Sequence, residues 1–423
     1  MAGRGRPFRE AGAVRLLVLC PHYDPDVAPT GDVMTSIVSE LARRGHEIRV
    51  VTSLPWYRRH RVEPDWRGRP VRSGVARGGV RVTRVHPFPT AKGSVAARAA
   101  GFAGFTALAA ACAVAARDRP DAVLAMSPPI TLGLAGWAAA RRWRVPLVFN
   151  LQDIFPDAAI DTGAIKGRRV VAAARRLERF IYDRASAVTV LSEDMRANVA
   201  AKLDAGRSGS VRVIPNFVDT SRIRPRSRDT AYRAEHGLGD RTVVMYAGNV
   251  GFSQPLDLLV AAARAHRHRD DVVFVVNGEG SARPALEASA AGLPNVVFVG
   301  YQPTERLDEV LATADVHVVV LGEGLARSSV PSKIYSILAA GRPVVASVDP
   351  DTELPRMIDE AGCGVAVAPG DQLAFDAAVA TLLDDPVGRD AMGRRGRAHV
   401  EACMTPQAVA AAYEALFSEL GRR

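Results

Sequence analysis

The sequence of 423 residues contains 48% hydrophobic and 24% charged residues, a composition typical of a globular protein with two or three domains. Its four cysteines are widely spaced and form no Cys-x-x-Cys pair, which argues against a zinc site or a disulfide framework and favours a reducing compartment. Residues 1–12 are polar and lack the apolar core of a signal peptide, so we expect a disordered arm and a cytoplasmic protein.

The formal charge of +10 is unevenly distributed. Residues 1–215 hold 34 Lys and Arg against 18 Asp and Glu, whereas residues 216–423 hold 21 against 27. A basic half suits nucleic acid, anionic lipid or a phosphorylated substrate. The sequence shows no helix-turn-helix pattern and no basic strand with interleaved aromatic residues, which argues against nucleic acid. We therefore predict a peripheral protein on the inner face of the plasma membrane, attracted by anionic lipid.

Short apolar runs alternate with helical segments through the first half of the chain. The predicted strands are residues 16–20, 47–52, 80–85, 122–125, 146–150, 187–191 and 211–214. The predicted helices between them are residues 33–44, 99–116, 130–142, 167–184 and 193–203. Such alternation predicts a parallel sheet covered by helices. Residues 54–79 interrupt the pattern with seven arginines, three prolines and two tryptophans, which indicates a long, mobile, basic loop.

The predicted helix at 99–116 contains no charged residue. Its length is that of a marginal membrane span, but alanine is only weakly apolar. Packing on the sheet is the favoured interpretation, while membrane insertion and attachment to a membrane surface stay open.

A second series of strands follows an arginine- and proline-rich linker at residues 215–230. These strands are residues 243–247, 272–276, 296–299, 316–321, 344–347 and 365–367. They are valine-rich, as expected for parallel strands buried on both faces. The predicted fold is therefore α/β, with two doubly wound, Rossmann-like domains at residues 13–215 and 216–405.

Residues 327–353 combine a short helix with a buried strand. Pro331 suits the first position of a helix, and Gly341 followed by Pro343 ends it. Ile334 and its apolar neighbours would face inward, leaving Lys333 in the first turn beside unpaired N–H groups. This arrangement is suited to a phosphate group, although a single lysine is more often only a solvated surface residue.

Ligands of parallel sheets bind beyond the carboxyl ends of the strands. The loops there are residues 21–32, with Gly31 just before a helix, and residues 152–161, 248–255, 277–281 and 300–302. They contain no G-x-G-x-x-G, so a dinucleotide fingerprint is absent. The pairs Asp24/Asp26 and Asp349/Asp351 resemble metal-binding motifs, but a proline between two aspartates is common in turns, and we predict no metal.

Six segments in order resemble the retaining glycosyltransferases of family 4 with the GT-B fold, in particular the polysaccharide-assembly subgroup of WbuB-like aminosugar transferases. They are GHEIRVVTS, NLQDIFPDAAIDTG, VIPNFVD, YAGNVGFSQPLDLLVAAA, VPSKIYSILAAGRPVVAS and TPQAVAAAYEALFSEL. The resemblance implies two domains facing across a cleft and a C-terminal helix, residues 406–423, that crosses back to the N-terminal domain.

The resemblance also implies the function. A UDP-sugar, carrying an N-acetylated or deoxy amino sugar, would be held mostly by the C-terminal domain, and the acceptor would be lipid-linked or a polysaccharide precursor. Lys333 would meet the diphosphate, and Asp153 would contact the acceptor or the donor sugar, with Asp157 as a second candidate. No cofactor or metal is implied. The residues assigned to the donor are Gly31, Gly248, Asn249, Gln254, Glu279, Tyr301, Lys333, Ser336, Thr352 and Glu353.

Three departures from the family pattern leave alternatives open. Ser328 and Ser336 stand where the family has paired glutamates, and Gln152 stands where it has histidine. Asn249 and Gln254 replace the usual Arg/Lys pair. A degenerate scaffold protein therefore stays possible, as does a UDP-sugar 2-epimerase, which would need acid–base residues that the loop around Gln152 does not supply in number.

Overall fold

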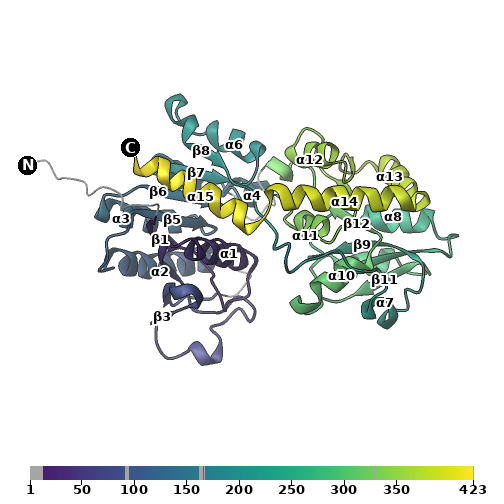
Figure 1. Cartoon of the computed structure of the whole chain (residues 1–423), viewed down its shortest axis with the longest axis horizontal. Coiled ribbons are helices and arrows are strands. Elements are labelled where there is room, and N and C mark those ends of the chain that lie inside the picture. Colours follow the sequence, from purple (N-terminus) through teal and green to yellow (C-terminus); the bar gives the residue numbers. More distant parts are fainter. Residues whose placement is uncertain (1–12, 91–94, 162–164, 166, 328–329, 423) are drawn as a thin grey trace, which may run out of the picture. The chain divides into compact units, whose positions relative to one another are not determined.

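The computed structural model describes residues 13–422, except 91–94, 162–164, 166 and 328–329 (Figure 1). The chain forms two compact units, which are treated separately below. Unit 1 comprises Met1–Pro215 and Pro406–Arg423, and unit 2 comprises Asn216–Thr405. The predicted arm at 1–12 and the predicted site residue Ser328 lie outside the described residues.

Within its described residues, unit 1 contains an eight-stranded sheet with the order β3-β4-β2-β1-β5-β6-β7-β8. Its strands are β1 Arg15–Leu19, β2 Glu47–Ser53, β3 Val71–Val75, β4 Arg81–Val85, β5 Ala122–Ser127, β6 Leu147–Leu151, β7 Ala187–Val190 and β8 Val211–Val213. All neighbours pair in parallel except β3, which pairs antiparallel to β4. Leu16 on β1 pairs with Ile48 on β2 and with Ala122 on β5, so the centre of the sheet is buried on both faces.

The prediction of one long mobile loop at 54–79 is wrong. Strand β3 lies within it, and the short helices η1 Pro64–Trp66 and η2 Arg77–Gly79 flank this strand. The guanidinium carbon atoms of Arg72 and Arg84 lie 5.7 and 5.0 Å from the ring centroid of Trp66. The cation–π contact of Arg72 and the edge ladder hold a residue that composition alone assigned to a flexible segment, and Arg84 of β4 stacks on the same ring.

The helices of unit 1 lie on both faces of its sheet. They are α1 Pro29–Arg43, α2 Val95–Val114, α3 Leu132–Trp143, α4 Asp157–Asp161, α5 Arg168–Tyr182, α6 Glu193–Ala200 and α15 Pro406–Gly421, with the short helix η3 Ala205–Ser210. Helix α2 packs on α3, and α1 packs on α15. Because Pro29 pre-forms the first turn of α1, Gly31 lies inside this helix rather than just before it, which corrects the predicted boundary.

Helix α2 is only partly covered by the rest of unit 1. The segment Ala97–Val114 is long and apolar enough to cross a membrane by length and composition, and 28% of it is buried. Phe105, Ala109 and Ala113 form the buried face, whereas Phe102 is 38% exposed. Packing on the sheet therefore accounts for one face of α2, and the other face is apolar and exposed.

The C-terminal helix α15 docks on the sheet of unit 1, as the resemblance implied. Asn150 on β6 donates a hydrogen bond from Nδ2 to the Tyr413 hydroxyl at 3.0 Å, and this hydroxyl lies 3.3 Å from the Thr189 hydroxyl on β7. Glu414 on α15 pairs with Arg44 at 3.0 Å. Residues at the end of the chain thus complete the core of the first unit.

Unit 2 contains a six-stranded parallel sheet with the order β11-β10-β9-β12-β13-β14. Its strands are β9 Thr242–Ala247, β10 Val272–Asn277, β11 Val296–Val299, β12 Val316–Val320, β13 Val344–Ser347 and β14 Gly364–Val367. Its helices are α7 Ala231–Glu235, α8 Asp257–Ala265, α9 Arg283–Ser289, α10 Leu307–Thr313, α11 Lys333–Ala339, α12 Glu353–Ala361, α13 Gln372–Asp384 and α14 Pro386–Cys403, with the short helices η4 Thr304–Arg306 and η5 Leu325–Arg327. The prediction of two doubly wound parallel α/β domains is confirmed.

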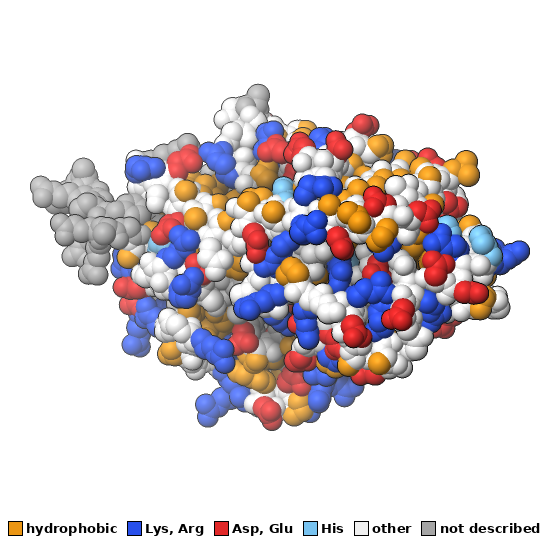
Figure 2. Space-filling model, turned by 45° about the vertical axis from the view of Figure 1, so that its right-hand side comes forward, with side chains coloured by type: hydrophobic (Ala, Val, Ile, Leu, Met, Phe, Trp, Pro, Cys, Tyr) orange, Lys and Arg blue, Asp and Glu red, His pale blue; other side chains and the backbone are white. Residues whose placement is uncertain are grey.

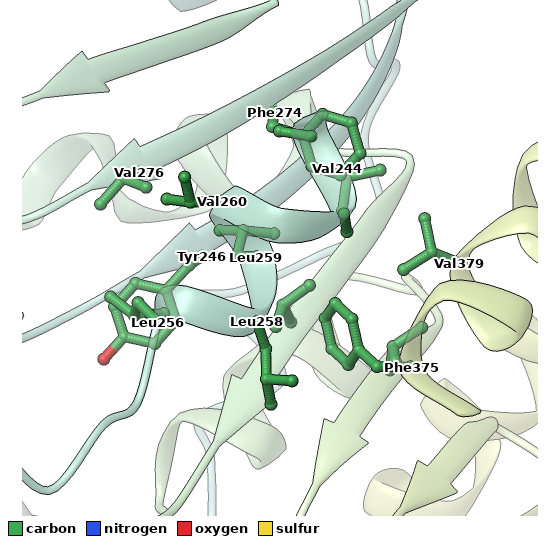
Figure 3. Packing of buried hydrophobic residues seen from close by; sticks show 14 of the residues in the cluster. Val244, Tyr246, Leu256, Leu258, Leu259, Val260, Phe274, Val276, Phe375 and Val379 are labelled. Carbon is green, nitrogen blue, oxygen red and sulfur yellow. The ribbon is translucent and has the colours of Figure 1, made fainter. Parts of the chain in front are cut away.

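The core of unit 2 fixes the strand ends that carry the site. Figure 3 shows side chains of α8, including Leu258 and Leu259, packed towards Phe375 and Val379 of α13, and Tyr246 of β9 lies in the same cluster. Burying a side chain of this size contributes roughly 1.5–3 kcal/mol. The Tyr246 ring is therefore held rigidly, while its hydroxyl points out of the cluster (Figure 3).

The predicted linker is tied to unit 2 along most of its length. Arg397 on α14 donates to the backbone oxygens of Thr220 at 2.9 Å and Ile223 at 2.7 Å, and Arg228 pairs with Asp315 at 2.8 Å. The arginines of this segment and of α14 thus act as side-chain donors to backbone carbonyls.

Acidic and basic side chains are intermixed over the face shown in Figure 2.

Candidate functional site

The loops that follow the strands of unit 2 are joined to one another at the carboxyl edge of the sheet. Gly248 N, after β9, donates to Asn277 O at the end of β10 at 2.9 Å. Gly322 N, after β12, donates to Ser253 O at 2.9 Å. The structure therefore brings together three loops from neighbouring strands, and two of them carry residues that the sequence assigned to the donor.

Glycines allow these loops to approach closely. A Cβ atom at Gly278 would collide with the carbonyl group of Gly248, and one at Gly280 would collide with the carbonyl group of Val250. Gly248 also has a φ of +145°, a conformation that L side chains rarely adopt. The glycines in GNVG and NGEG are thus required for backbone-to-backbone packing between the two segments.

Lys333, the first residue of α11, reaches from the next loop to this glycine edge. Its Nζ atom lies 3.8 Å from the centroid of the Tyr246 ring, and a Cβ atom at Gly248 would lie only 2.7 Å from it. The Tyr246 hydroxyl donates to Asn249 O at 2.6 Å, which fixes the ring beneath the ammonium group. Among the residues that the structure describes, no carboxylate forms an ion pair with Lys333.

Burial lowers the pKa of Lys333 to about 7, from an ordinary value of 10.5. The cause is the loss of hydration of the ammonium group, which disfavours the charged form. The π face of Tyr246 acts in the opposite direction, because it attracts a cation. A diphosphate bound here would supply the missing counter-charge, so the lysine is poised to gain a proton when an anion binds.

Glu279 and Tyr301 lie on one side of this edge, near the ends of β10 and β11. Arg283 Nη1 contacts Glu279 Oε1 at 2.6 Å, and the Tyr301 hydroxyl donates to Glu279 O at 3.2 Å. The side chains of Tyr301 and Phe252 are 57% and 86% exposed. Two accessible aromatic rings and an exposed carboxylate could contact a base and a ribose.

Asn249 and Gln254 occupy the turn that leads into α8. Asn249 Nδ2 donates to Gln254 Oε1 at 3.4 Å, and a Cβ atom at Gly251 would lie 2.6 Å from Asn249 Nδ2. Neither side chain is charged, so this loop itself supplies no positive charge; the cations at the glycine edge are Lys333 on α11 and Arg283, whose Nη1 donates to Gly278 O at 2.6 Å.

Three further predicted donor residues differ in accessibility. Ser336 lies one turn after Lys333 on α11 and is partly exposed. Thr352 is only 2% exposed, and its hydroxyl donates to Asp349 O at 2.7 Å, so a side-chain contact with a sugar would require this turn to open. Glu353 begins α12 and is partly exposed.

Gly31 of unit 1 lies directly beneath a histidine. A Cβ atom at this position would lie 2.9 Å from His22 Cβ and 3.2 Å from Asp26 O, so only glycine fits without displacement. The loop that precedes α1 therefore packs on the first turn of the helix. Gly31 serves this packing, and its prediction as a donor contact stays a prediction.

Asp153 follows β6 and is partly exposed. The neighbouring Gln152 is buried, and its Nε2 atom donates to Asn150 Oδ1 at 2.9 Å. Asp157 forms an ion pair with Lys202 Nζ at 2.6 Å. The roles of Asp153 and Asp157 towards a substrate stay predictions.

Aspartates of the two Asp-Pro-Asp segments accept hydrogen bonds from backbone N–H groups of neighbouring loops. Asp26 Oδ1 accepts hydrogen bonds from the backbone N–H groups of Trp56 and Tyr57 at 3.1 and 3.0 Å. Asp349 accepts from Gly324 N at 3.0 Å. Each carboxylate thus holds a neighbouring loop by its backbone.

Sequence reasoning missed Tyr246, His22 and Arg283. Tyr246 lies in a buried valine-rich strand and looked like a core residue, which it also is. His22 follows directly after the first strand, with Asp26 four residues later, and this spacing was a usable signal. Arg283 could have been noticed as a cation just after the NGEGS segment.

Comparisons with known proteins were made for the whole chain. The family description "Glycosyl transferase 4-like domain" matches residues 30–216, and "Glycosyl transferases group 1" matches residues 241–385. WcaI of Escherichia coli, named as a glycosyl transferase of colanic acid biosynthesis, is 27% identical over 381 residues, which cover 88% of this chain and 92% of WcaI.

Two solved structures share the fold over nearly the whole chain. Sucrose-phosphate synthase from Thermosynechococcus elongatus has a TM-score of 0.74 at 19% identity, covering 96% of this chain and 99% of the synthase. HepE from Anabaena, solved in complex with UDP-glucose, has a TM-score of 0.69 at 16% identity, covering 96% of this chain and all of HepE.

Proposed function

Because the chain belongs to the family 4 glycosyltransferases and has the GT-B fold, we propose that it transfers a sugar from a UDP-sugar to a lipid-linked or polysaccharide-precursor acceptor. The observation that carries the donor assignment is Lys333, held on Tyr246 beside Gly248 without a carboxylate partner among the described residues. An ammonium group at a glycine edge is suited to a diphosphate.

The remaining donor contacts follow from this anchor. The diphosphate meets Lys333 and the loop with Asn249 and Gln254, and the uridine lies towards Glu279 and Tyr301. The UDP-glucose in HepE supports a uridine nucleotide, since HepE has the same fold. The donor sugar then lies towards Glu353.

The chemistry requires stabilisation of a leaving diphosphate. Negative charge grows on the phosphate oxygen as the glycosidic bond breaks, and the partly buried ammonium group of Lys333 offers a positive charge. Such preorganised charge is worth several kcal/mol. We propose retention of the anomeric configuration, with Asp153 contacting the acceptor or the donor sugar and no metal taking part.

The acceptor and the location follow from the family and from the surface of unit 1. WcaI is named for the biosynthesis of colanic acid, and we take this as support for a polysaccharide precursor as acceptor. An amino sugar is proposed from the resemblance to WbuB-like transferases. The apolar outer face of α2 and the positive charge of unit 1 suit a peripheral protein on anionic lipid at the inner face of the plasma membrane.

A panel of nucleotide sugars tests the donor. A ligand at 100 times its dissociation constant adds about 2.7 kcal/mol of stability, so a UDP-sugar should raise the unfolding temperature of the wild type and not that of Lys333→Met. Turnover is then measured with membrane lipid extract as acceptor. Donor binding without turnover would favour the scaffold, and isomerisation of the UDP-sugar without acceptor would favour the epimerase.

Membrane association is tested with vesicles of anionic and neutral lipid. Arg58, Arg59 and Arg61 are exposed in the segment after β2. Neutralising all three should weaken binding to anionic vesicles and leave donor binding unchanged. Equal binding of the variant and the wild type would contradict a role for this segment.

A further inference from the structure

A buried chain of polar side chains leads from the C-terminal helix to the segment of unit 1 that carries Asp153. Its four members are Tyr413 on α15, Thr189 on β7, Asn150 on β6 and Gln152 just after β6. None of the four is more than 7% exposed. Polar groups in a core cost stability unless they are hydrogen-bonded to one another, so four of them in one layer indicate a specific role.

The amide group of Asn150 lies at the centre of this chain. Asn150 stands opposite Thr189 in the pairing of β6 with β7. Its Nδ2 atom donates to the Thr189 hydroxyl at 3.1 Å and to the Tyr413 hydroxyl at 3.0 Å, which uses both amide hydrogens. Its Oδ1 atom accepts from Gln152 Nε2 at 2.9 Å. The two hydroxyls therefore decide which end of the Asn150 amide faces Gln152.

Tyr413 is held by its ring and by its hydroxyl. The hydroxyl lies 3.3 Å from the Thr189 hydroxyl and closes a triangle of hydrogen bonds with Asn150. Burial raises the pKa of Tyr413 to about 12, so the hydroxyl stays protonated at neutral pH and has a hydrogen to donate within the triangle. The ring stacks on Phe417 of the same helix, with the centroids 6.0 Å apart. Tyr413 is thus a fixed anchor for the Asn150 amide.

Gln152 is anchored through both its backbone and its side chain. Its backbone N–H donates to Ser127 O at 3.0 Å, which extends the pairing of β5 and β6 one residue beyond Leu151. Asn150 and Gln152 are two residues apart on extended backbone, so their side chains share the face of the sheet on which α15 docks. Asp153 follows directly. The contact with Asn150 therefore holds the chain immediately before Asp153.

The segment after Asp153 is held as well. Ile154 is completely buried, and Asp157 on α4 pairs with Lys202 Nζ at 2.6 Å. Lys202 also pairs with the buried Glu178 at 2.7 Å. Asp153 thus lies between two anchored points. Such support suits a residue that contacts a reacting group, because small errors of position reduce the rate of a reaction strongly.

We propose that Tyr413 is a positioning residue for the sugar transfer and acts on Gln152 through Asn150. By fixing Gln152 it sets the place of Asp153, the residue proposed to contact the acceptor or the donor sugar. This inference rests on the proposed function and adds a residue that lies 263 positions after Asn150 in the chain. An amide at residue 152 suits the role, because it donates to Asn150 throughout the neutral pH range, whereas an imidazole changes its charge there.

The positioning role is tested first by kinetics. Tyr413→Phe keeps the ring on Phe417 and removes only the hydroxyl. It should lower kcat about tenfold and leave KM for the UDP-sugar unchanged, because the donor is held mostly by unit 2. The rates are measured with the UDP-sugar that stabilises the wild type and with membrane lipid extract as acceptor.

Phe417→Leu is the matched control for the docking of the helix. Phe417 is 1% exposed and stacks on the Tyr413 ring, but it takes no part in the hydrogen bonds. The leucine variant should lower the unfolding temperature and leave kcat unchanged. An equal loss of kcat in both variants would overturn the proposal, because the loss would then follow from looser packing of α15.

A double-mutant cycle tests the route through Gln152. Gln152→Leu removes the side-chain amide at the other end of the chain. Tyr413→Phe should lower kcat in the wild type and have little further effect in Gln152→Leu, since both substitutions break the same connection. Independent, multiplicative losses of kcat would show that Tyr413 does not act through Gln152 and would overturn the proposal.

Hydrogen exchange followed by mass spectrometry tests the same role without any substrate. Tyr413→Phe should accelerate exchange of the backbone N–H groups in residues 151–160, because their anchor on the sheet is weakened. Phe417→Leu should accelerate exchange in α15 only. Wild-type exchange in residues 151–160 of Tyr413→Phe would contradict the positioning role.

The two failures can be told apart. If no UDP-sugar binds the wild type, the proposed function is wrong, and the positioning role in sugar transfer falls with it even where exchange changes. If a UDP-sugar binds and Tyr413→Phe has the kcat of the wild type, the positioning role is wrong and the donor assignment stands.

Discussion

Replacing Lys333 by methionine should stabilise unit 2 and abolish donor binding. Methionine has a similar length and no charge, so the packing against Tyr246 and Gly248 is largely kept while the cost of burying an ammonium group disappears. A residue retained at a cost in stability is expected at a binding site. The opposite signs of the two effects make this substitution informative.

The magnitude follows from the pKa of Lys333, about 7 in the folded protein against 10.5 ordinarily. At about 1.36 kcal/mol for each pKa unit, burying the charge costs roughly 5 kcal/mol at pH 6. Loss of the cation–π contact with Tyr246 offsets about 1–2 kcal/mol of the gain. The methionine variant should therefore be roughly 3 kcal/mol more stable at pH 6.

The gain should shrink as the pH rises. Between pH 7 and 10.5 the unfolded chain binds more protons at this lysine than the folded chain does, so the stability of the wild type increases with pH in this window. From pH 6 to pH 9 the advantage of Lys333→Met should fall by roughly 2.5 kcal/mol. A constant advantage would mean that Lys333 does not titrate in this range.

The sequence provides a convenient assay. All four tryptophans, Trp56, Trp66, Trp137 and Trp143, lie in unit 1. Urea unfolding followed by far-UV circular dichroism reports both units, whereas tryptophan fluorescence reports unit 1 and serves as the internal control. Lys333→Met should shift only the transition that fluorescence does not detect. Destabilisation of that transition at pH 6 would refute the reasoning.

Three further outcomes are expected. Lys202→Met should destabilise unit 1 by about 3 kcal/mol in fluorescence-detected unfolding, because it leaves the buried Glu178 and the ion-paired Asp157 without their cation. The affinity for UDP in calorimetric titrations should fall about 50-fold from pH 7 to pH 9, since the neutral form of Lys333 must gain a proton on binding, and a flat profile would contradict this. Tyr246→Leu should weaken UDP binding more than Tyr246→Phe, which keeps the ring beneath Lys333; equal losses would instead assign the effect to the hydroxyl.

The fold was predictable because its strands are continuous apolar runs with short connections. The predicted strands at 296–299 and 344–347 have the observed bounds, and most others differ by one or two residues. The prediction failed at residues 54–79, where contacts with distant residues, rather than local sequence, determine whether a strand forms. Strand β3 forms because β4 provides an edge and Trp66 provides a surface for arginines, and neither partner can be identified from composition.

The site was predictable where a residue type has one main use. A lysine at a strand-end helix and glycines in a strand-end loop pointed to the same edge, and the structure brings them together. Tyr246 could not be found in this way, because the apolar pattern of a buried strand does not indicate which aromatic ring will contact a cation. The roles of Asp26 and Asp157 also depend on partners distant in sequence. Asp26 accepts a hydrogen bond from the Trp56 backbone, and Asp157 pairs with Lys202.

Serine in place of the family glutamate at 336 does not by itself indicate an inactive protein. A glutamate one turn from Lys333 would form an ion pair with it, raise its pKa and make the ammonium group charged before the donor arrives. Without that carboxylate, the positive charge is supported mainly by the Tyr246 ring. If Lys333 binds the donor diphosphate as proposed, the diphosphate itself would supply the counter-charge, and donor binding would take up a proton and weaken at high pH. On the proposed function, serine at 336 and asparagine at 249 would therefore change how Lys333 is charged, while Lys333 and the glycine edge beside it are both present.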